Sequence, residues 1–262
     1  MPSAFRVRCA RRTHRRLELA PNPQKSAEWN RGTYLVEGSG HCGACHTPKS
    51  ILGADKTDQP LQGAQPQNWF VPKIDNDQRR GLGSWSVGDI VKYLKTGRNA
   101  HSGAAALMAE VAANATSKLS DEDLHAVALY LKYIVAKPND AASALEHAFM
   151  DAGRGIFSDS WSGCHQADGE GVGRMFPPLA HNANDQSVDP TTVVRVIIEG
   201  AQTVSTKARP TPFAMPAYNW KLSDDEIAAV ATFVRNAWGN AASAVTTDEV
   251  TSLREKLHAK LQ

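Results

Sequence analysis

The sequence contains no run of about 18 apolar residues, which is the length that a membrane-spanning helix requires. It also lacks any stretch of strand length with a clear alternation of apolar and polar residues. Its four cysteines do not form the pattern of a disulfide framework. These absences argue against membrane spanning and against a disulfide-stapled fold. At 262 residues, 42% hydrophobic and 21% charged, the chain is long enough for two domains that each bury a core.

Acidic residues are missing from the first 17 positions, which carry six arginines. A secretory signal needs an apolar segment after its basic residues, and none follows here. Three interpretations remain: a solvated tail, a weakly transit-like segment, or out-of-frame residues ahead of a truncated gene. We expect the last, because ordinary composition begins only after Pro21. Residues 1–25 are left unassigned, and Cys9 is given no role.

The rest of the chain is mildly acidic. The whole sequence has 29 basic and 27 acidic residues, and without the six arginines the basic count falls to 23. No basic patch of the kind that tracks a phosphate backbone is visible. We therefore expect no nucleic-acid partner.

An internal repeat organises the chain. The segments "KLSDEDLHAVALYLKYI" and "KLSDDEIAAVATFVRNAW" lie 103 positions apart, and each has the apolar spacing of an amphipathic helix. Ser120 and Ser223 are the expected N-caps, each with an acidic residue three positions later. The same offset relates Gly97 to Gly200, which are expected to end a second pair of helices. For the later helix of that pair we expect Asp189 as the cap.

A third expected helix precedes each of two Cys-His pairs, in "AEWNRGTYLVEG" and "ALEHAFMDAGRGIFSD". The repeat predicts an all-α fold of two tandem small domains with long irregular loops. Such loops indicate that a cofactor fills the centre of each domain. The predicted division is an unassigned segment (1–25), a first domain (26–135), a linker (136–142), a second domain (143–240) and a C-terminal tail (241–262).

The chemistry begins at Cys42, Cys45 and His46, which form the C-x-x-C-H signature of covalent haem attachment. Two thiols at this spacing can each add to a porphyrin vinyl group, and the histidine then reaches the iron. A redox-active dithiol would need a strand-helix context, and a zinc site would need a further Cys or His pair at metal spacing. The sequence offers neither, so haem c is the predicted cofactor.

The second copy keeps Cys164 and His165 but has Trp161 where the first cysteine would stand. Methionine thioethers are the expected second axial ligands. Met215 lies 6 residues before its "KLSD", whereas Met108 lies 10 residues before the earlier one, so the registers differ. Core packing is the alternative role for either methionine.

Prolines after each histidine are placed to hold the ring. A ligand histidine needs its other ring nitrogen fixed, usually by a backbone carbonyl. The candidates are a turn at Pro72 and a turn at Pro177 and Pro178, with loop stiffening as the alternative. The remaining histidines of the body show no partner pattern and are expected on the surface or in loops: His41, His101, His125, His147 and His181.

Four stretches carry a family resemblance: "EWNRGTYLVEGSGHCGACHTPK", "GLGSWSVGDIVKYLKTGR", "CHQADGEGVGRMFPPLAHN" and "MPAYNWKLSDDEIAAVATFVRNAWGN". From about Trp29 onward the chain resembles the second and third haem domains of the multihaem cytochrome c subunit of bacterial membrane-bound alcohol, aldehyde and gluconate dehydrogenases. The family's first domain is expected to be absent here.

The resemblance implies that the all-α fold consists of two tandem small cytochrome c-type haem domains with long irregular loops. It implies haem attachment at Cys42 and Cys45. It also implies four axial ligands, His46, Met108, His165 and Met215. It further implies an electron-transfer subunit, not an enzyme itself, that works beside a quinoprotein or flavoprotein catalytic subunit. The implied acceptor is quinone or a terminal oxidase, and the implied location is the periplasmic side of the inner membrane with peripheral membrane association.

Trp161 departs from the family, whose last domain normally has a complete C-x-x-C-H. We hypothesise a single thioether from Cys164, with the indole against the unreacted vinyl edge. A non-covalent haem and an empty second domain are the alternatives. Two other functions stay open at this point: a five-coordinate, peroxidase-like or ligand-sensing haem protein, and a truncated non-functional remnant.

Overall fold

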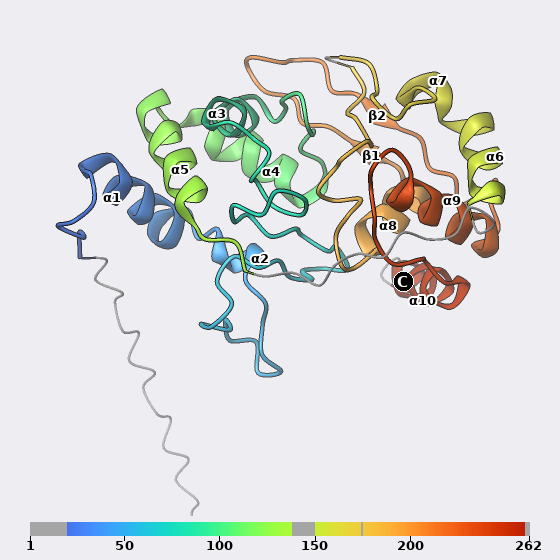
Figure 1. Cartoon of the computed structure of the whole chain (residues 1–262), viewed down its shortest axis with the longest axis horizontal. Coiled ribbons are helices and arrows are strands. Elements are labelled where there is room, and N and C mark those ends of the chain that lie inside the picture. Colours follow the sequence, from blue (N-terminus) through green and yellow to red (C-terminus); the bar gives the residue numbers. More distant parts are fainter. Residues whose placement is uncertain (1–19, 138–149, 174, 260–262) are drawn as a thin grey trace, which may run out of the picture.

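The computed structural model describes residues 20–137, 150–173 and 175–259. Figure 1 shows two groups of helices side by side, one from each half of the chain. We call residues 20–137 the first half and residues 150–259 the second half. The first half contains α1 (Ala27–Thr33), the π-helix η1 (Tyr34–Ser39), α2 (Gly43–His46), α3 (Val87–Thr96), α4 (Ala106–Asn114), the 3-10 helix η2 (Thr116–Lys118) and α5 (Asp121–Tyr133). The second half contains α6 (Asp151–Ser160), α7 (Ser162–His165), α8 (Thr191–Glu199), β1 (Ala201–Gln202), β2 (Ala214–Met215), α9 (Asp224–Asn236) and α10 (Thr247–His258).

The two halves repeat one helix crossing. Helix α1 packs across α5 in the first half, and α6 packs across α9 in the second. A glycine stands at each crossing. A Cβ at Gly32 would lie 2.1 Å from the carbonyl oxygen of Ala126. At Gly153 the corresponding distance, to the carbonyl oxygen of Ala229, is 2.2 Å. Both contacts are impossible for a side chain, so close helix approach requires glycine at these two positions.

The predicted helix ends are largely confirmed. The hydroxyls of Ser120 and Ser223 accept the expected backbone N–H, and Ser223 completes a reciprocal capping box. Gly97 and Gly200 end α3 and α8 with φ of 73° and 75°. The expected cap at Asp189 was wrong by one position, because Pro190 is the N-cap of α8. The Asp189 carboxylate instead accepts the Thr191 N–H at 2.8 Å, in a local turn before the helix.

Each half has its own hydrophobic core. The first core is built from α3, α5 and η1, with Val36 and Leu124 fully buried. The second core is built from α6, α8 and α9. The apolar side of α10, at Val250, Leu253 and Leu257, is buried in the second core. The segment expected as a C-terminal tail therefore packs on the body of the protein.

The all-α prediction is confirmed, with one small addition. Strands β1 and β2 form a two-residue antiparallel pair in which Ala201 is opposite Met215. Helices α4 and η2 were not predicted; α4 contains Met108, and η2 lies between α4 and α5. This extra structure explains why Met108 stands 10 residues before "KLSD" and Met215 only 6. The expected linker (136–142) and the expected helix before the second Cys-His pair lie partly outside the described residues.

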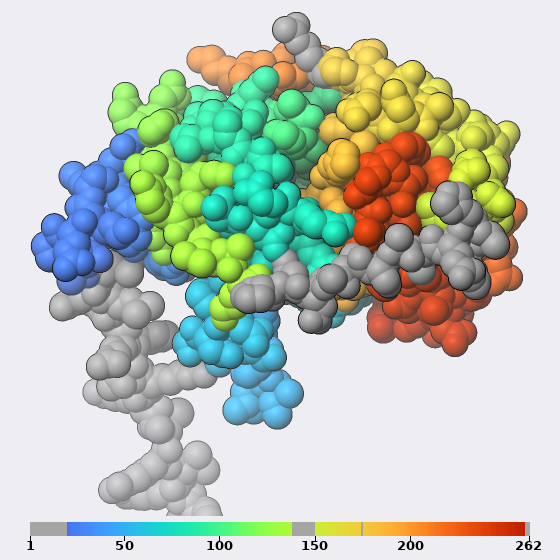
Figure 2. Space-filling view, viewed as in Figure 1, coloured from blue at the N-terminus to red at the C-terminus, as the bar shows by residue number. Residues whose placement is uncertain are grey.

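Hydrogen bonds join the two halves directly, and Figure 2 shows them in contact along the face in view. The Arg79 guanidinium donates from Nε and Nη2 to the Gln186 side-chain oxygen at 3.0 and 2.8 Å. The Asn182 side chain donates to the His101 carbonyl at 3.3 Å. An isolated antiparallel bridge pairs Ala105 with Thr203. Segments of the second half that line the cavity are therefore hydrogen-bonded to the first half.

Candidate functional site

One cavity of about 1590 Å³ runs through both halves of the protein. All the predicted site residues line it: Cys42, Cys45, His46, Met108, Trp161, Cys164, His165 and Met215. Aromatic and aliphatic side chains form most of the remaining wall, among them Trp85, Leu94 and Val193. The structure thus brings together residues that lie up to 173 positions apart in the sequence.

The first Cys-His group lies on the short helix α2, which follows η1 and lines the cavity. The π-helix η1 follows α1 without a break and is followed by Cys42, the N-cap of α2. Cys45 and His46 occupy the last turn of α2, and neither Cys42 nor Cys45 is in a disulfide. Burial raises the pKa of the Cys42 thiol to about 11, so this thiol is protonated at neutral pH.

The ring of His46 is fixed by a backbone carbonyl. Its Nδ1 lies 2.8 Å from the carbonyl oxygen of Pro72, which confirms the expected role of the Pro72 turn. Burial lowers the pKa of His46, and the hydrogen bond to Pro72 offsets only part of that effect. The neutral imidazole donates from Nδ1 to the carbonyl and leaves Nε2 free to bind a metal.

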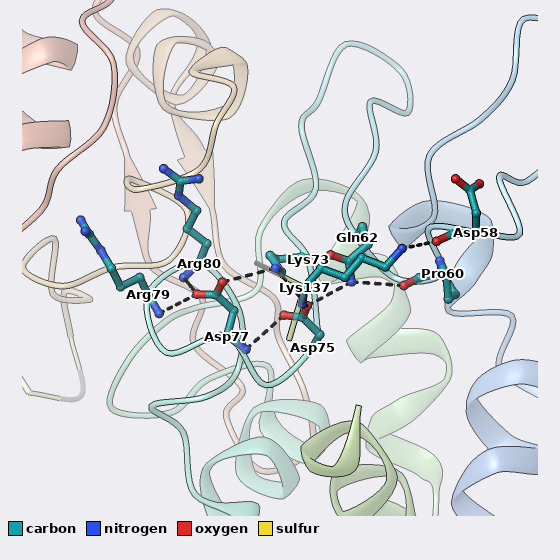
Figure 3. A network of polar contacts seen from close by, with 9 residues as sticks. All are labelled: Asp58, Pro60, Gln62, Lys73, Asp75, Asp77, Arg79, Arg80 and Lys137. Atoms are coloured by element: carbon teal, nitrogen blue, oxygen red, sulfur yellow. Dashed lines mark hydrogen bonds and ion pairs between the residues drawn. The ribbon is translucent and has the colours of Figure 1, made fainter. Parts of the chain in front are cut away.

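A buried polar network holds the segment after Pro72 in place (Figure 3). Lys73 Nζ lies 3.0 Å from an Asp75 carboxylate oxygen and 3.3 Å from Asp77. Asp75 is fully buried and also accepts from the Gln62 side chain at 3.0 Å. These contacts pair the buried charges with one another, so neither Lys73 nor Asp75 is buried without a partner.

The second Cys-His group repeats the arrangement. His165 is the last residue of α7, and its Nδ1 lies 3.2 Å from the carbonyl oxygen of Pro177. This contact confirms the expected role of the second proline turn. Burial lowers the pKa of His165 as well, so this imidazole is also neutral near pH 7.

Trp161 occupies the position of the missing cysteine. Its side chain is 5% exposed and packs on Tyr218, with ring centroids 4.2 Å apart. The indole Nε1 is buried and has no hydrogen-bond partner within the described part of the chain. Cys164 is exposed and not in a disulfide. The second site therefore keeps one thiol and one histidine, and the indole of Trp161 occupies the place of the missing cysteine.

The two methionines reach the cavity from different structures. Met108 lies in the first turns of α4 and packs against the first core, whereas Met215 lies in β2 and packs against the second. Both side chains are partly buried. Sequence spacing placed them in different registers, and helix α4 shows how the longer segment brings Met108 to the cavity wall.

Several cavity residues were missed by sequence reasoning. His101 stacks on Trp85 with ring centroids 5.4 Å apart, and His41 and His181 also line the cavity. His125 instead contacts Glu28 on the surface. His147 lies outside the described residues. No short sequence motif marks His41, His101 and His181. Each lies in a loop, and only the folding of the chain places that loop at the cavity wall.

The residues present suit a haem. The cavity is apolar and large, two neutral histidines present a free ring nitrogen, and thiols stand beside each histidine. At the first site two thiols are available, and at the second only one. A porphyrin could therefore be held at both sites, with a different number of covalent links at each.

Comparisons with known proteins agree with this geometry. The family described as "Cytochrome c" matches residues 30–134 and 150–238. The chain is 38% identical to the alcohol dehydrogenase (quinone) cytochrome c subunit of Gluconacetobacter polyoxogenes, over 91% of this chain and 55% of that protein. It is 36% identical to the gluconate 2-dehydrogenase cytochrome c subunit of Pantoea cypripedii, over 90% of this chain and 58% of that protein. It is 32% identical to the fructose dehydrogenase cytochrome subunit of Gluconobacter japonicus, over 87% and 52% respectively.

The chain spans about half the length of these relatives. Among the described residues, no helix combines the length and the apolar character needed to cross a membrane.

Proposed function

This chain belongs to the cytochrome c family, and from that membership we propose that it is an electron-transfer subunit carrying two haems, not a catalytic subunit. When bound, haem c supplies a one-electron iron couple whose potential is set by its axial ligands. The observation that carries the proposal is the shared cavity, which both Cys-His groups line. Two sites that share one cavity suit the passage of electrons from one to the other without a mobile carrier.

At the first site Cys42 and Cys45 would hold haem c through two thioether links. Each link would form by addition of the S–H across a vinyl double bond, with sulfur on one carbon and hydrogen on the other, so that no external oxidant or reductant is needed. His46 would hold the iron through Nε2 while its Nδ1 donates to the Pro72 carbonyl. Met108, on α4, would hold the iron as well. With both ligands present the iron would have no position for a substrate, which suits an electron carrier.

At the second site Cys164 would provide one link, and His165 and Met215 would hold the iron. The burial of Trp161 against Tyr218 supports this assignment, because the indole already fills the space of a second cysteine. We propose that one vinyl group of the second haem stays unreacted beside the indole.

A pyridine haemochrome spectrum tests the two attachments, because each remaining vinyl group shifts the absorption band. The protein is produced in a host with export and haem-attachment machinery. We expect two haems per chain, one with two thioethers and one with a single thioether. Trp161→Cys completes the C-x-x-C-H motif and should give two doubly linked haems. Cys164→Ala should leave the second haem extractable by acid acetone while the first stays attached.

Other outcomes would contradict the assignment. One doubly linked haem per chain, with nothing at the second site, would reject the second haem. No haem at all in a folded chain would reject the electron-transfer function and favour a non-functional remnant. Carbon monoxide tests the methionines, because a methionine-ligated ferrous haem resists it. Rapid carbon monoxide binding at the first haem would mean that Met108 is not a ligand and that the site is five-coordinate.

The electron donor is proposed from the relatives, which are cytochrome subunits of dehydrogenases for alcohols, gluconate and fructose. We expect a quinoprotein or flavoprotein catalytic subunit as donor, and quinone or a terminal oxidase as acceptor, on the periplasmic side of the inner membrane. Peripheral contact with the membrane is part of this proposal. The test mixes the oxidised holoprotein with a quinoprotein alcohol dehydrogenase catalytic subunit and ethanol, or with a flavoprotein gluconate dehydrogenase subunit and gluconate. Haem reduction that requires the subunit supports the proposal, and no reduction by either class contradicts it.

A further inference from the structure

The hydrogen bond from His46 to Pro72 depends on a loop that belongs to the first half but is held by the second. This loop, residues 64–72, is a narrow turn closed by the antiparallel bridge between Ala64 and Val71. Its tip has positive φ at Gln67 (53°) and Asn68 (59°), a left-handed backbone that glutamine rarely adopts and asparagine adopts more readily. Such a tip persists only where neighbouring structure holds it.

Helix α8 of the second half supplies that support. The Thr192 hydroxyl accepts the Phe70 N–H at 3.0 Å and donates to the Phe70 carbonyl at 2.5 Å. One threonine thus satisfies both backbone groups of a residue two positions before Pro72. Both Thr192 and Phe70 line the cavity beside the first site.

Arg195, one turn further along α8, holds the tip. Its Nη1 donates to the carbonyls of Gln67 at 2.8 Å and Asn68 at 3.0 Å. Its guanidinium lies 4.1 Å from the centroid of the Trp69 ring. Just before the helix, Asp189 accepts a hydrogen bond from the Gln65 side chain. The contacts of Asp189 and α8 together therefore cover the loop from residue 65 to residue 70.

We propose that Thr192 and Arg195 are positioning residues for the first haem, acting across the interface through the 64–72 loop. They fix the Pro72 carbonyl, the carbonyl fixes His46 Nδ1, and that hydrogen bond sets how strongly the imidazole donates electrons to the iron. The inference rests on the proposed function, since it requires haem at the first site. It gives the second half control over a redox centre that it does not ligate.

The test uses a matched pair of substitutions in the first turn of α8. Thr192→Val removes the two hydrogen bonds to Phe70 at nearly constant size and charge. Thr191→Val makes the same chemical change one residue earlier, where the hydroxyl makes no hydrogen bond within the described residues. Arg195→Lys keeps the charge but loses the planar fork over Trp69, and it provides a second variant if Thr192→Val does not fold.

The readouts are spectroelectrochemical titration and low-temperature EPR of the first haem in the holoprotein. A weaker hydrogen bond at Nδ1 makes His46 a poorer donor and disfavours ferric iron, so the potential should rise. We expect a change of about three- to tenfold in the reduction equilibrium, where tenfold is about 59 mV for one electron. The EPR g values of the first haem should shift, while the second haem and Thr191→Val stay at wild-type values.

Haem content separates the two possible failures. If the wild type binds no haem at the first site, the proposed function fails. If both haems are present but Thr192→Val and Arg195→Lys match Thr191→Val in potential and g values, only the positioning proposal is overturned. A shift of the same size in Thr191→Val would overturn it equally.

Discussion

A methyl group added at Gly153 would collide with the helix that crosses it. The new Cβ would lie 2.2 Å from the Ala229 carbonyl oxygen and 2.7 Å from the Phe233 Cβ. Two of its close neighbours are backbone atoms, so α6 and α9 must move apart instead of a side chain rotating away. Overpacking of this kind typically costs about 1 to 3 kcal/mol, and we expect Gly153→Ala to lie at the upper end of that range.

Gly155 lies on the same helix and provides the control. A Cβ there meets no atom within 4 Å, so Gly155→Ala should stabilise the protein by about 0.5 to 1 kcal/mol through helix propensity alone. The two variants differ in composition by nothing except the position of one methyl group. The expected changes in the free energy of unfolding have opposite signs, so their comparison isolates the effect of the helix crossing.

Urea denaturation followed by circular dichroism at 222 nm measures the difference. With a slope of about 2 kcal/mol per molar urea, Gly153→Ala should lower the midpoint by about 1.5 M and Gly155→Ala should raise it slightly. Separation of α6 from α9 should also loosen the second site, so Gly153→Ala should lose haem there first. Equal midpoints for the two variants would refute the close crossing of α6 and α9.

Three further predictions concern the second half. Arg235 is fully buried and donates to the carbonyls of Asp185 and Ser187, so Arg235→Ala should cost about 3 to 5 kcal/mol in urea titrations; the exposed Arg154→Ala should cost less than about 1 kcal/mol. Burial raises the pKa of Asp185 to about 8, although Arg235 offsets part of the effect. The unfolded chain loses this proton from about pH 4 and the folded chain only near pH 8, so stability should fall as the pH rises through that window. Asp185→Asn should flatten this part of the pH profile, and an unchanged profile would contradict the assignment. Ser223→Ala removes the cap of α9 and should cost about 1 kcal/mol by thermal melting, with recovery in Ser223→Asp.

The parts of the site that sequence reasoning found depend on local signals. The C-x-x-C-H spacing places Cys42, Cys45 and His46 on one short helix whatever the rest of the chain does. Serine three residues before an acidic residue caps a helix through contacts inside one turn. The proline turns lie within 26 residues of the histidines that they hold, and a proline-rich turn with a free carbonyl was a sufficient clue.

What escaped sequence reasoning depends on contacts between distant segments. Helix α4 has no strong apolar periodicity of its own, and it forms where the chain must carry Met108 back to the cavity. Arg235 and Asp185 sit in segments whose sequence gives no sign that charged groups will be buried there. The residue types in a polar segment do not show whether that segment is exposed to solvent or packed against another part of the chain.

The sequence by itself determined the repeat, the helices and the chemistry of each attachment point, because these follow from periodicity, capping and spacing over a few residues. Only the tertiary structure decided that the two halves share one cavity and that Thr192 hydrogen-bonds to Phe70, 122 positions away. The reason is physical: a backbone N–H or carbonyl in a loop must find some partner, but the sequence does not specify which one. The partner is determined when the chain folds and α8 of the second half packs against the 64–72 loop of the first half.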